Sequence, residues 1–162
     1  MSSTRQTSRR KRPLSRKPPE LALSVQYGVD ESALPSRPRL RSWAKAALFD
    51  DAKITLRFVG AREGRGLNRD YRGRDYATNV LSFAYREFKP LAGDIVLCAP
   101  VIAREARAQR KPLEAHYAHL VVHGMLHLQG FDHENNGEAE AMEARESEIV
   151  IGLGYPDPYE VR

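Results

Sequence analysis

The sequence predicts an α+β fold, in which a mixed four-stranded sheet packs against about five helices. Segments that alternate apolar and polar residues recur in the first two-thirds of the 162-residue chain, interleaved with segments of helical spacing. The last third has helical spacing throughout. One helix there is apolar around much of its circumference, which indicates that it is buried in a core.

Four strands are expected, at residues 21–27, 53–59, 79–85 and 93–99. LALSVQY and KITLRFV alternate apolar and polar residues, as strands with one buried face do. NVLSFAY and GDIVLCA follow, and Lys89-Pro90 marks the connection between them. With no internal repeat and no second domain, these elements predict one folded unit.

Five helices are expected, at residues 36–50, 61–71, 100–109, 112–129 and 137–152. Ser36 is a candidate cap for the first of them. The fourth has the strongest pattern, because Pro112 suits a first helical turn and Gly130 can adopt the left-handed conformation that ends a helix. This buried helix is the central one of the predicted fold.

Residues 1–20 are expected to form a disordered basic tail, and residues 21–162 the folded domain. The first 19 residues hold seven Lys and Arg and no acid, with too few apolar side chains to offset the entropy of ordering. They also lack the apolar core of a secretory signal. Such an arm either contacts RNA nonspecifically or is inert.

Charge is unevenly distributed over the rest of the chain. Outside the tail, 19 basic residues stand against 21 acidic ones, but residues 53–111 hold 13 basic and six acidic residues. A basic middle suits an anionic partner such as nucleic acid, but charge alone favours the simpler explanation of solvated charged faces. Cys98 is the single cysteine and no apolar stretch approaches membrane-spanning length, so we expect a cytoplasmic protein without a membrane partner.

The five histidines all lie within 18 residues. His123 and His127 are four residues apart on the central helix, so their imidazoles project from one face, and His133 follows the predicted turn at Gly130. This is the ligand spacing of the metzincin motif, H-E-x-x-H-x-x-G-x-x-H. The spacing predicts a three-histidine metal site with an open position for water. Zinc is the leading candidate, while imidazole also suits nickel, copper and iron. The alternative is three core or capping histidines.

Gly124 departs from the metzincin motif. It stands where zinc peptidases carry the glutamate that acts as general base, which argues against peptide hydrolysis. A phosphodiester is a different substrate, because a metal and an arginine can stabilise much of the charge that develops on its oxygens. A metal-bound water would then be the nucleophile, leaving a 5′-phosphate and a 3′-hydroxyl.

The string HGMLHLQGFDH resembles the H-G-x-L-H-L-x-G-x-D-H signature of the YbeY family of endoribonucleases, also called rRNA maturation factors. LNRDYRGRDYATNVLSF, GDIVLC and LGYPDPY resemble further blocks of that family, in the same order. The resemblance covers roughly residues 21–160 and leaves the basic tail unexplained.

This resemblance implies a mixed four-stranded sheet, one zinc-type ion and a single-strand-acting endoribonuclease. It implies a role in 16S rRNA 3′-end maturation and ribosome quality control, with small-subunit precursor RNA and the ribosome or small-subunit proteins as partners, and no DNA. Carried over by position, His123, His127 and His133 are the metal ligands, and Arg72 acts on the RNA. The alternatives are a non-catalytic ribosome assembly factor with a structural metal and a divergent metallopeptidase.

Neighbouring polar residues have secondary expectations. His119, one turn before His123, is expected to support the site rather than act as a fourth ligand, and His116 is expected to face solvent. Asp132 is a candidate to hold an imidazole or to stabilise a turn. Asn68, Asn79 and Ser82 are candidates to line the cleft or to cap.

Overall fold

A computed structural model describes residues 17–85, 89–132 and 134–160. The predicted basic tail therefore lies outside the described residues except for its last four, and so does His133. The first strand begins at Leu21. No helix in these ranges is long and apolar enough to cross a membrane.

A four-stranded mixed sheet forms the centre of the described chain, in the order β1-β2-β4-β3. Its strands are β1 (Leu21–Tyr27), β2 (Ala52–Val59), β3 (Val80–Tyr85) and β4 (Leu91–Cys98). β2 runs parallel to both neighbours, whereas β3 runs antiparallel to β4 and lies at one edge. The predicted fold class is confirmed.

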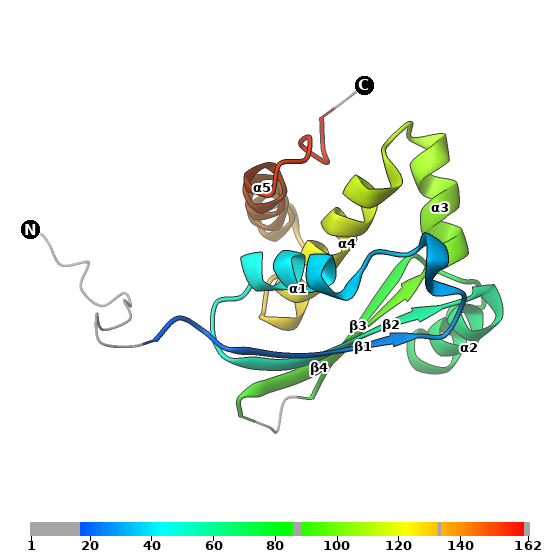
Figure 1. Cartoon of the computed structure of the whole chain (residues 1–162), viewed down its shortest axis with the longest axis horizontal. Helices are drawn as coiled ribbons and strands as arrows, with labels where there is room; N and C mark the ends of the chain where they lie inside the picture. The colour runs from blue at the N-terminus through cyan, green and yellow to red at the C-terminus, as the bar shows by residue number, and fades with distance from the viewer. Residues whose placement is uncertain (1–16, 86–88, 133, 161–162) are drawn as a thin grey trace, which may run out of the picture.

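Helices lie mainly on one side of this sheet (Figure 1). They are α1 (Arg37–Ala46), α2 (Ala61–Arg72), α3 (Ala99–Ala108), α4 (Leu113–Leu128) and α5 (Asn136–Gly152), with a short 3-10 helix, η2 (Glu31–Ala33). Side chains cap two of them as local chemistry predicts: Ser36 accepts from the N–H of Arg39, and Asn135 accepts from that of Glu138. Gly130, at φ 110°, follows the end of α4.

The main core lies between the sheet and α4. This helix contacts β3, β4, α1, α3 and α5, and eleven of its sixteen residues are buried. At Gly124 the helix comes so close to the sheet that a Cβ there would lie 3.0 Å from the side chain of Ile95. A side chain at position 124 would therefore crowd Ile95, and close packing of α4 on β4 favours glycine there.

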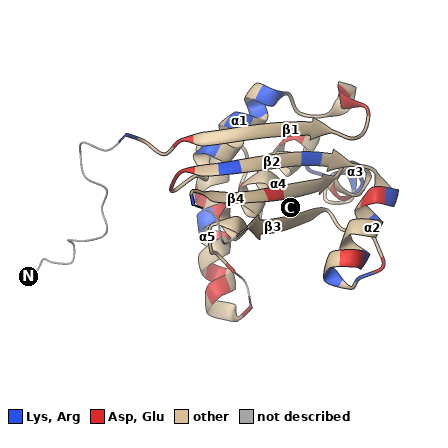
Figure 2. Cartoon of the chain, turned by 90° about the horizontal axis from the view of Figure 1, so that it is seen from below, with Lys and Arg blue, Asp and Glu red and all other residues tan. Residues whose placement is uncertain are grey.

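A second, smaller core lies on the other face of the sheet, where α2 packs near the carboxyl end of β4. Val59, Val96 and Cys98 are buried there against Leu67 of α2. No other helix of residues 17–85, 89–132 and 134–160 covers this face, and Figure 2 looks directly onto it. The sheet therefore has one covered face, next to the histidines, and one that is largely open.

Candidate functional site

Two of the three predicted ligand histidines lie side by side on α4. The ring centroids of His123 and His127 are 6.1 Å apart, and their planes are inclined at 79°. Both side chains are partly exposed, although the helix around them is buried. The spacing of four residues thus does what the sequence predicted, which is to place two imidazoles on one accessible face.

Glu146 of α5 holds His123 in place. Its carboxylate is fully buried, and one oxygen lies 2.5 Å from Nδ1 of His123. Burial raises the pKa of a carboxyl, but hydrogen bonds from His119 and His123 outweigh it and lower the pKa of Glu146 to about 2. The carboxylate accepts a hydrogen bond from Nδ1 of His123, which leaves Nε2 as the ring nitrogen that could bind a metal.

The other oxygen of Glu146 accepts from two further groups. His119 Nε2 lies 2.8 Å from it, and the Tyr159 hydroxyl donates to the same oxygen. Burial, together with this hydrogen bond to Glu146, raises the pKa of Tyr159. Nε2 of His119 is therefore directed at Glu146, as expected of a supporting residue rather than a fourth ligand.

His116 does not face solvent as expected, because its side chain is only 4% exposed. Its Nε2 lies 2.9 Å from a carboxylate oxygen of Glu105 on α3, which also accepts from Asn79 at 3.0 Å. Burial lowers the pKa of His116 despite the opposing effect of Glu105. α3 packs against α4 and covers this histidine. The periodicity of α4 alone could not predict this burial, because it depends on a second helix.

Arg72 ends α2 at the edge strand of the sheet. Its Nη2 donates to the carbonyl oxygen of Ser82 at 2.7 Å, and its guanidinium lies 4.9 Å from the centre of the Phe83 ring. α4, the helix that carries the histidines, packs against the same strand. A guanidinium keeps its charge and can bind phosphate through two N–H groups.

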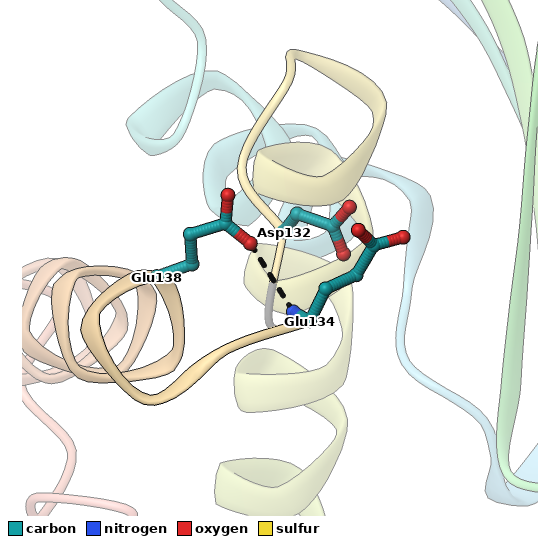
Figure 3. Close-up of side chains that lie close together, drawn as sticks. All are labelled: Asp132, Glu134 and Glu138. Atoms are coloured by element: carbon teal, nitrogen blue, oxygen red, sulfur yellow. Dashed lines mark hydrogen bonds between the residues drawn. The ribbon is translucent and has the colours of Figure 1, made fainter.

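An acidic group lies beside the third predicted ligand position. Oxygens of Asp132, Glu134 and Glu138 all lie within 4.8 Å of one another, and the Glu134 N–H donates to Glu138 at 3.3 Å (Figure 3). Clusters of this kind raise the local attraction for cations in general.

Comparison with known proteins identifies the family. The family model described as "Endoribonuclease YbeY" matches residues 37–154. A protein named endoribonuclease YbeY from Aromatoleum aromaticum is 61% identical over 142 residues, which are 86% of this chain and 92% of that protein. One of the same name from Cupriavidus pinatubonensis is 58% identical over 147 residues, 88% of this chain and 73% of that protein. The chain belongs to the YbeY family.

A solved structure supports the fold. The solution structure of TM1509 from Thermotoga maritima matches 85% of this chain and 99% of its own, with a TM-score of 0.51 and 24% sequence identity. At that sequence identity, the match supports the fold alone. The family name carried by the relatives favours a nuclease over the metallopeptidase alternative.

Sequence reasoning missed Glu146, Tyr159 and Glu105. Glu146 is one of several acids on a helix of low apolar periodicity, so nothing local distinguishes it from a solvated residue. Asn68 was a cleft candidate, but its side chain is buried and donates to the carbonyl of Tyr76 at 2.8 Å. Ser82 contributes its backbone carbonyl, to Arg72.

Proposed function

We propose that this YbeY-family chain is a metal-dependent endoribonuclease that hydrolyses single-stranded RNA in ribosomal RNA precursors, including the 3′ end of 16S rRNA. The proposal extends to the ribosome or small-subunit proteins as partners and to the cytoplasm as its location. The observation that carries it is the pair His123 and His127 on one face of α4, with Glu146 hydrogen-bonded to Nδ1 of His123.

These residues fit a zinc-type ion. Two imidazoles one helical turn apart suit a tetrahedral N-ligand set, and a carboxylate hydrogen-bonded to the other ring nitrogen of a ligand histidine is a common support for zinc. His133 would complete the set from the turn after α4. When bound, the ion would act as a Lewis acid and make a hydroxide-like nucleophile available near neutral pH.

The chain's own residues orient and stabilise the reacting phosphate. Arg72 is held by the Ser82 carbonyl and the Phe83 ring, which leaves N–H groups of its five-donor fork to contact a phosphate oxygen. Its fixed positive charge would stabilise the charge that develops as the phosphodiester opens. Glu146 keeps His123 in one tautomer and one orientation throughout.

The test is cleavage of end-labelled small-subunit precursor RNA by the wild type and a His127→Ala variant with matching circular dichroism. The proposal requires cutting by the wild type alone, with 5′-phosphate and 3′-hydroxyl ends. Equal cutting by both proteins would indicate a contaminating nuclease. If neither protein cuts, or if His127→Ala unfolds, the structural-metal assembly factor becomes the better interpretation. A 2′,3′-cyclic phosphate would contradict water as the nucleophile.

A further inference from the structure

An aromatic cluster lies on the open face of the sheet, at the edge strand. Tyr71 and Phe83 meet edge to face with ring centroids 5.5 Å apart, and Tyr85 follows Phe83 by two residues on β3, so its side chain lies on the same face of the sheet. Phe83 belongs to the small core under α2. Tyr71 is 64% exposed and Tyr85 is 41% exposed, so two tyrosine rings beside the partly buried Phe83 are open to solvent.

The register of the sheet continues this cluster across the open face. Tyr85 pairs with Ala92, and Ala92 pairs with Lys53, so the three side chains form one row on the same face. The small Ala92 leaves a shallow hollow between the tyrosine and the lysine, and Lys89 lines the hollow too. The row and Lys89 together provide an aromatic ring, a flat surface at Ala92 and two positively charged side chains.

The charges around this surface favour an anionic ligand. Neither Lys53 nor Lys89 forms an ion pair with any residue in the described ranges, whereas the acids of the neighbouring α2 region are paired with arginines, as in Arg65–Asp75. Asp94 is the acid within the surface, and it accepts the hydroxyl proton of Tyr85. Figure 2 shows basic positions on β2 and an acidic one on β4 across this face.

We propose that Tyr71 and Tyr85 are a nucleobase-stacking site for single-stranded RNA, which binds nucleotides next to the phosphate engaged by Arg72. Tyrosine rings interleaved with lysines are the combination that binds unpaired bases and backbone phosphates together. The site is continuous with Arg72, because the same Phe83 ring contacts both Arg72 and Tyr71. This inference rests on the proposed function. Stacking on the two tyrosines is how the nuclease would recognise unpaired RNA.

Binding of a fluorescent single-stranded RNA of about 12 nucleotides tests it, measured by anisotropy with metal-loaded protein. Tyr71→Ala and Tyr85→Ala should each weaken binding about 5- to 100-fold, and Phe at either position should restore it. An abasic oligomer of equal length should bind the wild type and the Ala variants equally. Tyr76→Ala is the control, since Tyr76 is also exposed but has no ring contact with the cluster.

Cleavage kinetics separate this site from the reacting centre. A stacking site beside the scissile phosphate predicts that the Ala variants raise KM and keep kcat at saturating RNA. Unchanged RNA affinity in both Ala variants, or equal losses with the abasic oligomer, would overturn the stacking site while leaving the proposed nuclease intact. A wild type that neither binds nor cuts RNA would overturn both. An RNA duplex that binds as tightly as the single strand would also overturn it.

Discussion

Replacing Glu146 by Gln should weaken metal binding without unfolding the protein. The carboxylate accepts one proton from His123 on one oxygen, and protons from His119 and Tyr159 on the other. An amide of the same shape accepts on one side only, so its NH2 group must face at least one N–H or O–H donor. His123 then loses the acceptor that fixes its tautomer, or His119 and Tyr159 lose theirs.

The size of the effect follows from this geometry. Loss of a supporting partner of a ligand histidine lowers metal affinity about 10- to 100-fold, or about 1.4 to 2.8 kcal/mol. The metal-free protein should also lose about 1 to 3 kcal/mol of unfolding free energy. The side chain at position 146 is fully buried, so a donor that faces its NH2 group cannot turn to water instead. Competition with a chromophoric chelator gives the affinity for zinc and cobalt, and urea unfolding gives the stability.

Glu105→Gln is a matched control. Glu105 also bonds a histidine of α4, at 2.9 Å from His116, but that histidine is not a proposed ligand. This variant should lose stability and keep its metal affinity. Equal metal affinities for wild type and Glu146→Gln, or equal losses in the two variants, would refute the reasoning that Glu146 positions His123.

Three further predictions follow from the packing. Gly124→Glu should destabilise the protein by about 1 to 3 kcal/mol or more in urea unfolding, because its Cβ would meet Ile95 at 3.0 Å; a variant as stable as wild type would contradict the packing of α4 on β4. Arg72→Lys should cleave RNA at least about tenfold more slowly than wild type with unchanged stability, because a lysine lacks the planar fork, and an equal rate would remove Arg72 from the site. Burial raises the pKa of the Cys98 thiol, so less thiolate forms at a given pH. A disulfide reagent should therefore label Cys98 only as the protein unfolds. Rapid labelling of the folded protein would contradict the burial of this thiol.

Much of the fold could be predicted because its elements are encoded locally. Alternation identified the first two strands, apolar runs on either side of Lys89-Pro90 identified the other two, and capping and spacing identified α1 to α5, with differences mainly at the ends. α1, for example, ends at Ala46 rather than at residue 50. β4 begins at Leu91 rather than at residue 93, because Leu91 pairs with Ala52 in the ladder. Such end points depend on pairing partners that a local pattern does not contain.

The histidine site likewise combines a local feature that the sequence predicts with contacts that it does not predict. The spacing of His123 and His127 follows from helix pitch, which is a local property, and their placement on one face was predictable for that reason. The prediction that His116 faces solvent was wrong because the burial of this side chain depends on α3, which packs over it.

The element types, the histidine spacing on the central helix and the basic character of the middle of the chain are local properties, because they depend on residues near one another. Helix docking is what makes Glu146, 23 residues from His123, the buried carboxylate behind it. The tertiary structure also places Arg72 against Ser82 at the sheet edge and Tyr85 in a row with Lys53. These contacts arise from helix docking and strand register, which join segments distant in the chain and are set by packing of the whole core.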